Sequence, residues 1–362
     1  MKNIKKKIWA LMSAAVTTSA LVVSMTGSSV TTVRDADGDG RYTVSDAQLT
    51  LRYLKGDYNP SSVRSFDFDG NGIISYVDAL KVLGYYSGSF QDDSLPGPVG
   101  ADSTAVATTS RYLRHYYGSI PSDAVSEYSL TVDPLDNTSS SGANAYSLNT
   151  LDNPGVDLDS DTAVVRLSEG TGFIVSDHVI ATAAHCVYDV DTNAFFNDST
   201  ITVVDGNNRI SFTPVYADIC KEYYLTQQEQ YDYALLYVEE DLSEYGKFEI
   251  GVPLIEYINA HGEVTVSGFP RYLPNGSTDE SRSDRYKSTG NITINYGDFF
   301  RCDAFATNGD SGGPVYATEQ YGDYEYNTVI AIFTSYLVNN DTYGLKITPD
   351  MLKFYKGNSY IE

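Results

Sequence analysis

From Thr162 onward, short runs rich in β-branched or aromatic residues recur between turn residues, and this pattern constrains the fold more than any other feature. The runs are Thr162 to Leu167, Gly172 to Val175, Thr202 to Val204, Tyr233 to Val238, Val264 to Ser267, Asn291 to Asn295, Pro314 to Tyr316 and Val329 to Phe333. Their length and spacing predict an antiparallel barrel or sandwich. A last apolar stretch, Pro349 to Tyr355, predicts a terminal helix. We therefore expect a mainly β chain.

Nearer the amino terminus, an acidic twelve-residue segment at 35–46 recurs 32 residues later at 67–78. Both copies fit a calcium-binding loop, because oxygen-bearing residues occupy the ligand positions and a glycine at position 6 permits the sharp turn. Arg41 and Ile73 would bind through backbone carbonyls. The expected Ca²⁺ ligands are Asp35, Asp37, Asp39, Arg41, Thr43, Asp46, Asp67, Asp69, Asn71, Ile73, Ser75 and Asp78. Two carboxylates about 4 Å apart repel by roughly 4 kcal/mol at an effective dielectric near 20, so folding is expected to require calcium.

A helical stretch follows each loop, at Ala47 to Leu54 and Ala79 to Tyr86, whereas no comparable helix precedes either loop. Such loop-then-helix halves differ from full EF-hands. Residues 33–90 closely resemble a type I dockerin, the module that anchors enzymes to the cohesins of cellulosomal scaffolds. The resemblance implies two structural Ca²⁺ ions, a cohesin partner and two binding orientations. The implied cohesin contacts are Val44, Ser45, Tyr76 and Val77.

Three local sequences in the β region carry the chemistry of a nucleophilic site. His185 lies in the run Thr182 to Cys186, Asp232 opens an apolar strand, and Ser311 lies in Gly309-Asp310-Ser311-Gly312-Gly313-Pro314. Glycines in that last run let the backbone aim N–H groups at a reacting oxygen. A lone histidine or a lone strand-end carboxylate is more often structural. The order His, Asp, Ser is nevertheless that of the chymotrypsin-type triad, so the three sequences reinforce one another.

Residues 160–357 resemble the trypsin-like serine endopeptidases, and among them the bacterial glutamyl-endopeptidase (V8-like) branch. The motifs are Gly170 to Phe173, Thr182 to Cys186, Tyr231 to Ala234, Ser267 to Pro270 and Gly309 to Pro314. The resemblance implies a chymotrypsin-like double six-stranded β-barrel. It implies Ser311 as the nucleophile, His185 as the general base and Asp232 as its orienting carboxylate. The N–H groups of Gly309 and Ser311 would form the oxyanion hole, and no cofactor would be needed for catalysis.

The specificity residues of that branch are not matched. A histidine and a nearby hydroxyl hold the substrate carboxylate there, but the aligned positions here are Phe333 and Ala306, and Tyr336 stands where a small residue is usual. Phe305 occupies the position of the aspartate that gives trypsin its preference for Lys or Arg. We therefore expect an apolar or small residue before the scissile bond.

Asp310 raises a question of maturation, because in trypsin-like enzymes this aspartate pairs with an amino terminus created by cleavage. Either another cation serves Asp310, or a cut between about Asn137 and Thr162 activates the enzyme and releases it from its dockerin. Of the three cysteines, Cys186 and Cys220 are one candidate pair for a disulfide bridge.

The predicted organisation is a signal peptide at 1–28, the dockerin at 33–90, a linker or pro-segment at 91–160 and the protease domain at 161–362. Four early lysines before an apolar run indicate secretion, with an uncleaved membrane anchor as the alternative. The location would be extracellular and cellulosome-associated, in a Gram-positive anaerobe. A formal net charge of -24 argues against binding nucleic acid.

Two other functions stay open from the sequence. The protease-like domain could be inactive and displayed as a binding or structural unit, although a complete triad argues against this. The dockerin alone would also fit a cellulosomal carbohydrase, which would need a pair of carboxylates across a glycan cleft. No such pair stands out in the sequence. Secreted peptide-bond hydrolysis is therefore the leading prediction.

Overall fold

The computed structural model describes most of the chain after the leader. The described residues are 35–37, 42–60, 62–86, 112–117, 156–158, 161–196, 199–273, 277–337 and 341–357. The predicted signal peptide, the calcium ligands Asp39 and Arg41, and most of the predicted linker lie outside these ranges. None of the described helices is long and apolar enough to cross a membrane.

Residues 35–86 form a small N-terminal module with two main helices, α2 (Val44–Leu54) and α3 (Tyr76–Tyr86). A 3-10 turn, η1 (Val63–Phe66), and the short strand β1 (Ile73–Ile74) lie between them. The two helices pack together over a small apolar cluster that includes Phe68 and Leu80. Both predicted helices are confirmed. Each begins three residues earlier than expected, and at α2 the reason is the Thr43 cap, whose hydroxyl accepts from Ser45 N.

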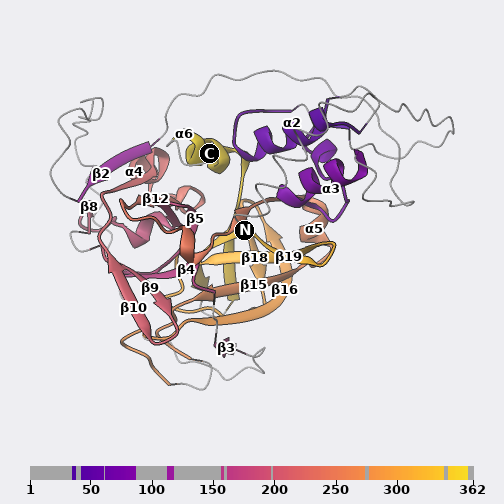
Figure 1. The fold of residues 1–362 in the computed structure, drawn as a ribbon. Coiled ribbons are helices and arrows are strands. Elements are labelled where there is room, and N and C mark those ends of the chain that lie inside the picture. The colour runs from indigo at the N-terminus through magenta and orange to yellow at the C-terminus, as the bar shows by residue number, and fades with distance from the viewer. Residues whose placement is uncertain are drawn as a thin grey trace, which may run out of the picture.

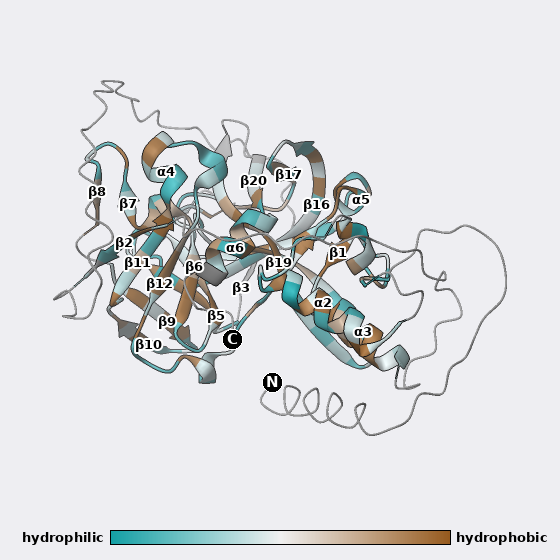
Figure 2. Cartoon of the chain, turned by 90° about the horizontal axis from the view of Figure 1, so that it is seen from above, coloured by the Kyte–Doolittle hydropathy of each residue, from teal (hydrophilic) through white to brown (hydrophobic). Residues whose placement is uncertain are grey.

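The first sheet has eight antiparallel strands in the order β10-β9-β4-β5-β6-β12-β11-β2 (Figure 1). Their bounds are β2 Tyr112–Tyr116, β4 Val164–Leu167, β5 Thr171–Ser176, β6 Val179–Thr182, β9 Ile201–Asp205, β10 Asn208–Phe212, β11 Tyr216–Cys220 and β12 Ala234–Tyr237. Phe173, Ile180 and Leu235 are among the side chains buried in its core. Figure 2 shows hydrophobic residues concentrated along these strands. No pairing among the described residues joins its two edge strands, β10 and β2.

The second sheet follows the order β13-β19-β18-β15-β16-β17-β20, and a further pairing of β19 with β20 closes six of these strands into a barrel. Their bounds are β13 Glu249–Ile250, β15 Glu263–Gly268, β16 Tyr286–Tyr296, β17 Phe299–Cys302, β18 Pro314–Tyr321, β19 Tyr324–Leu337 and β20 Asp341–Lys346. Phe300, Ile330 and Phe333 lie in its core. The barrel confirms half of the expected pair.

Smaller elements connect and cover the two sheets. They are β7 Tyr188–Asp189, β8 Ala194–Phe195, β14 Val252–Pro253, the helices α4 Lys221–Thr226, α5 Ile255–Asn259 and α6 Pro349–Gly357, and the 3-10 turns η2 Ala184–Cys186, η3 Glu229–Tyr231 and η4 Ser243–Tyr245. The predicted terminal helix corresponds to α6. Each of the eight predicted strands is also present, so the mainly β prediction is confirmed.

Two strands come from the segment that was predicted to be a linker. Strand β2 pairs with β11 at the edge of the first sheet, and β3 (Val156–Leu158) pairs with β16 in the second sheet. These residues therefore do not form a free linker, and the alternative of a pro-segment stays a prediction. Their backbone groups find partners far away in the chain, which local composition does not reveal.

The N-terminal module is docked on the β domain. Strand β1 pairs with β14 through Ile73 with Pro253 and Ile74 with Val252, and α3 contacts β18. Gly56, just after α2, lies against the backbone of Leu352 in α6, and both views place α2 beside α6 (Figures 1 and 2). The module is therefore joined to the barrel by a strand pairing and by helix packing, in addition to the chain connection.

We expect Tyr53→Phe to leave stability unchanged or to raise it by about 1–3 kcal/mol. Tyr53 is 1% exposed, and its hydroxyl has no hydrogen-bond partner in the described part of the chain. Removing a buried, unsatisfied hydroxyl removes its desolvation cost. Thermal and urea unfolding would measure the change, with Tyr53→Ala as the control that loses packing. A loss above about 1 kcal/mol for the phenylalanine variant would contradict this prediction.

Candidate active site

Ser311 lies in a tight loop between β17 and β18 that presses against the first sheet. The loop contains two glycines with positive φ, Gly309 at 101° and Gly312 at 83°. A Cβ at position 312 would lie 2.9 Å from Ala183 N and closer still to the Thr182 hydroxyl and the Thr171 carbonyl. Only glycine fits both this backbone conformation and this approach. The loop is thereby placed at the junction of the two sheets.

His185 and Asp232 meet because their strands are paired. His185 lies in η2, just after β6, and Asp232 ends η3, just before β12. The β6–β12 pairing sets Thr182 opposite Ala234, so both side chains extend from the same end of the pair. Asp232 Oδ2 lies 2.6 Å from His185 Nδ1, and Oδ1 accepts a hydrogen bond of 2.9 Å from the His185 backbone N–H. The carboxylate therefore fixes both the ring and the backbone of the histidine.

The electrostatics of this pair favour a charged imidazole. Burial opposes the imidazolium, but the charges and hydrogen bonds of Asp232 and Cys186 together raise the pKa of His185 well above its ordinary value. Asp232 is 4% exposed, whereas the His185 side chain keeps 32% of its surface. One side of the ring is thus anchored by a buried carboxylate, while the imidazole stays accessible to a reacting group.

The Ser311 loop lies directly beside the histidine. Cys186 Sγ donates to the Ser311 carbonyl at 3.2 Å, and Thr171 N donates to the same oxygen at 2.7 Å. Within the described residues, no hydrogen bond joins the Ser311 hydroxyl to His185. The structure therefore brings the three predicted residues to one junction, with the histidine and aspartate bonded and the serine on the adjoining loop.

Thr171 is a site residue that the sequence did not single out. Its hydroxyl donates to the Gly309 carbonyl at 2.7 Å and accepts from Phe269 N at 3.1 Å. Together with its backbone bond to Ser311, these contacts hold the carbonyls of Gly309 and Ser311. The only signal in the sequence is its place in the run Gly170 to Phe173.

Asp310 is a buried carboxyl beside the candidate nucleophile. Oδ2 accepts from Thr307 N at 2.9 Å, while Oδ1 has no hydrogen-bond partner among the described residues. Burial raises its pKa to about 7, although the Thr307 N–H and the charge of Arg282 act in the opposite direction. A pocket of ≈ 10 Å³, lined in part by Asp310, Gly268 and Phe305, adjoins it. Near neutral pH, the Asp310 carboxyl is therefore divided between its neutral and charged forms.

The expected specificity residues do not line an open pocket. Ala306 is 4% exposed and Phe333 is fully buried, and both belong to the core of the second barrel. Both side chains are packed against apolar neighbours, and their part in specificity stays a prediction. Only the backbone of Phe333 reaches the site, where its carbonyl accepts from Gly312 N at 2.7 Å. The side chain of Tyr336 lies outside the description.

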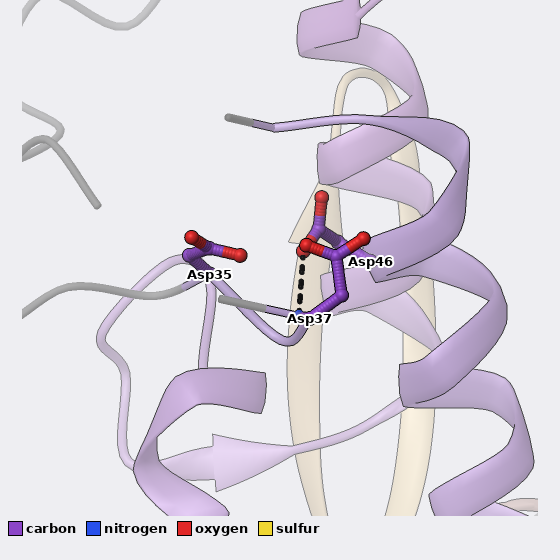
Figure 3. Close-up of side chains that lie close together, drawn as sticks. All are labelled: Asp35, Asp37 and Asp46. Atoms are coloured by element: carbon purple, nitrogen blue, oxygen red, sulfur yellow. Dashed lines mark hydrogen bonds between the residues drawn. The ribbon is translucent and has the colours of Figure 1, made fainter. Parts of the chain in front are cut away.

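In the N-terminal module, the first acidic repeat brings Asp35, Asp37 and Asp46 together (Figure 3). Each offers an oxygen within 4.8 Å of the others. Asp46 Oδ1 accepts from Ala36 N at 2.8 Å and from Asp37 N at 3.3 Å. Burial, with the charges of Asp37 and Asp35, raises the pKa of Asp46 to about 7 despite these bonds. The Thr43 hydroxyl accepts a hydrogen bond from Ser45 N at the start of α2.

The second repeat gathers Asp67, Asp69 and Asp78 in the same way. Asp78 Oδ1 accepts from Phe68 N at 2.6 Å, which matches the Asp46 bond to Ala36 in the first repeat. Burial and the Asp69 carboxylate raise the pKa of Asp78 well above its ordinary value. Lys81 forms an ion pair with Asp69. Two corresponding groups of carboxylates therefore exist, each with a chemistry that suits a hard divalent cation.

The other expected ligands of the second repeat make local hydrogen bonds. Asn71 Oδ1 accepts from Ile73 N at 2.7 Å, and Ser75 Oγ accepts from Val77 N at 3.0 Å. The Asn71 amide also donates to Glu319 of β18 at 2.8 Å. The loop is thus bonded to the β domain as well as to itself.

The residues expected to contact cohesin differ between the repeats. Ser45 is exposed and Val44 is partly buried, whereas Val77 is fully buried and Tyr76 packs with Tyr321 and Tyr326 of the β18–β19 hairpin. In this structure Val77 offers no surface to a partner, so that prediction is wrong. Gly70 and Asn71 of the second repeat are exposed.

All three cysteines are free and buried, so the proposed bridge between Cys186 and Cys220 is not present. Cys220 Sγ instead donates to the Tyr233 hydroxyl and to Glu222, both at 3.2 Å. Burial raises the pKa of this thiol to about 11. The β domain is therefore held by packing and hydrogen bonds.

Comparison with known proteins finds a family that is similar to the β domain. A family model for a trypsin-like peptidase domain matches residues 170–322, which include all three members of the predicted triad. Among solved structures, a Glu endopeptidase in complex with MPD is similar, with 17% identity and a TM-score of 0.46 over 57% of this chain and 97% of that chain. No curated protein matches the sequence. Residues 170–322 are therefore similar to a trypsin-like peptidase domain.

We expect the pKa of His185 to lie above the ordinary value of about 6.5 and to fall in Asp232→Asn, because the variant loses the charge that favours the imidazolium. NMR titration of the ring resonances can measure this, and only four histidines need to be assigned. Ser311→Ala serves as the control and should keep the raised value. An equal pKa in wild type and Asp232→Asn would contradict the assignment of the cause.

Proposed function

We propose that this chain is a secreted serine endopeptidase that hydrolyses peptide bonds with Ser311, His185 and Asp232. The observation that carries the proposal is the two-point contact of Asp232 with His185, at 2.6 Å to the ring and 2.9 Å to the backbone, beside the Ser311 loop. A serine hydroxyl is nearly inert at neutral pH without a positioned base. The match of residues 170–322 to the trypsin-like peptidase domain supports the same chemistry.

In the proposed reaction, the Ser311 oxygen attacks the substrate carbonyl carbon while its proton passes to His185 Nε2. Asp232 accepts from Nδ1, which selects the tautomer with a free Nε2 lone pair and stabilises the imidazolium. The carbon–nitrogen bond then breaks as His185 returns the proton to the leaving amine. A water molecule releases the acyl group from Ser311 by the same route. The N–H groups of Gly309 and Ser311 would stabilise the oxyanion of each tetrahedral intermediate.

The neighbours of Gly309 and Ser311 support this role for the loop. Their N–H groups share peptide planes with the carbonyls of Asn308 and Asp310. These carbonyls accept from Arg271 N at 2.6 Å and from Gly313 N at 2.8 Å, so rotation of either peptide group would break a hydrogen bond. Donors that are fixed before the reaction need no reorganisation when charge develops. The bond between His185 and the serine hydroxyl would form as substrate binds, since such contacts are often long in free enzymes.

For the N-terminal module, we propose a dockerin that binds two Ca²⁺ ions and anchors the enzyme to a cohesin of a cellulosomal scaffold. Asp35, Asp37 and Asp46 would hold one ion, and Asp67, Asp69 and Asp78 the other, with each ion neutralising carboxylates that otherwise repel. The donor chemistry fits the ion, because each group consists of oxygen ligands alone. Cohesin would contact the first repeat through Val44 and Ser45, since Val77 of the second repeat is fully buried.

The main alternative is a peptidase-like domain without activity that serves as a binding unit. The absence of a bond between His185 and the Ser311 hydroxyl among the described residues is the observation that favours it. A serine-directed covalent inhibitor distinguishes the two functions, because an inactive domain should leave Ser311 unmodified. Stoichiometric labelling would support the enzyme.

We expect Ser311→Ala to lower peptide hydrolysis by about a millionfold while fold and calcium binding persist. Without the hydroxyl there is no nucleophile for His185 to activate. Cleavage of a peptide library, mapped by mass spectrometry, measures both activity and the residue before the scissile bond. Ser243→Ala, a partly buried serine in η4, is the matched control and should keep full activity. Comparable cleavage by Ser311→Ala would overturn the assignment.

Calcium should raise the melting temperature of the whole chain, and chelation should reverse the rise. At a free concentration one hundred times Kd, a single site stabilises by about 2.7 kcal/mol. Asp78→Asn should lose the contribution of the second site, whereas Asp57→Asn, an exposed acid outside both loops, should retain it. Calorimetry with and without calcium measures the shift. An unchanged melting temperature in saturating calcium would exclude the ion.

A further inference from the structure

Arg282 is a buried arginine on the segment between β15 and β16. It is 5% exposed, and its backbone has φ of 47°, a left-handed conformation that is uncommon outside glycine. Asp279 holds the turn, because its carbonyl accepts from Arg282 N at 3.0 Å and its Oδ2 accepts from Ser283 N at 2.8 Å. A buried charge on an uncommon backbone persists only where its surroundings fix it.

The guanidinium of Arg282 joins the two sheets. Nε donates to the Phe269 carbonyl at 3.1 Å, just after β15 of the second sheet. Nη2 donates to Leu167 O at 2.9 Å and to Gly170 O, while Nη1 donates to Ser168 O at 3.2 Å. These last three carbonyls belong to the turn between β4 and β5 of the first sheet. The planar fork of an arginine suits such a set of acceptors, whereas a lysine offers only a point charge.

The segments that Arg282 joins are those that hold the Ser311 loop. Gly170 is followed by Thr171, whose N–H and hydroxyl donate to the carbonyls of Ser311 and Gly309. Phe269 donates its N–H to the Thr171 hydroxyl. A Cβ placed on Gly309 would lie 3.1 Å from Arg282 Nε, so the guanidinium is packed against the loop itself. Arg282 thus bonds to Gly170, and the next residue, Thr171, bonds to the carbonyls of Gly309 and Ser311. The N–H groups of these last two residues are the proposed oxyanion donors.

The charges of Arg282 and Asp310 also support the packing of the guanidinium against the Ser311 loop. A buried guanidinium is costly unless acceptors and negative charge surround it. Burial lowers the pKa of Arg282, and the Asp310 carboxylate acts in the opposite direction. Arg282 in turn favours the charged form of Asp310. No direct salt bridge joins the two side chains in the described part of the chain, so their attraction acts across the loop that contains Gly309.

We propose that Arg282 is a positioning residue for the proposed peptidase reaction, holding the Gly309 and Ser311 N–H groups in place and supplying, within the chain, the positive charge that Asp310 needs. The inference rests on the proposed function. The Arg282 guanidinium is present before any cleavage of the chain, so Asp310 would have a cationic neighbour from the start. An enzyme built in this way would be active without a newly formed amino terminus beside Asp310.

The test compares Arg282→Met with Arg285→Met in the full chain. Arg285 is a matched control, because it is 3% exposed and donates to the carbonyls of Val164 and Val204, outside the turn that Arg282 holds. Loss of oriented oxyanion donors should lower kcat of Arg282→Met at least about tenfold, with KM changed less than about twofold. Hydrogen exchange of peptides spanning 303–313 should become faster in this variant alone. Arg285→Met should lose stability with kcat within about twofold of wild type.

A second variant covers the case in which Arg282→Met does not fold. Arg282→Gly removes the guanidinium but suits the positive φ, and added guanidinium ion should restore part of its kcat. A folded variant that keeps kcat and exchange at wild-type levels overturns the inference. An equal loss of kcat in Arg285→Met, or a loss without faster exchange at 303–313, also overturns it. Failure of the proposed function is distinguishable, because wild-type Ser311 would then resist a serine-directed inhibitor while exchange would still report on the loop.

Discussion

The close contact between the Ser311 loop and the end of the first sheet is the constraint on which the site depends. At Gly312 the loop backbone lies against Thr171 and Ala183, at a separation that leaves no room for a side chain. That approach brings Ser311 beside the turn that carries His185, and it lets Thr171 bond to the carbonyls of Gly309 and Ser311. Residues of both sheets share one large apolar cluster, which contains Phe173 of the first sheet and Ile332 of the second. The geometry of the site therefore depends on the correct assembly of the two sheets.

The acidic repeats and the β domain are structurally connected. Strand β1, which lies within the second acidic loop, pairs with β14, and Asn71 of that loop bonds to Glu319 on β18. Anything that orders the second loop should therefore favour the docked module, because a ligand stabilises the arrangement to which it binds better. The two repeats have unequal surroundings at the start of their helices, because Ser45 is exposed whereas Val77 is fully buried.

Local sequence was sufficient to locate the candidate site and most strands, but it did not reveal contacts between distant segments. His185, Asp232 and Ser311 each lie in a distinctive run, and the β6–β12 pairing brings two of them together. Strands β2 and β3 have linker-like surroundings and acquire partners only from the folded sheets. Arg282 lies among charged and polar residues typical of an exposed turn. Its burial depends on carbonyls more than one hundred positions earlier in the chain. The burial of Val77 and Phe333 likewise follows from packing that no local pattern encodes.

The edge position of β2 changes what a cut in the chain would do. A nick between 137 and 155 leaves β2 hydrogen-bonded to β11, β1 to β14, and Gly56 of the module against α6. The two fragments would then remain together as a noncovalent complex, as in other proteins that are nicked in a connecting segment. Proteolytic maturation and departure from the scaffold would be two separate steps, since severing the backbone leaves these contacts intact.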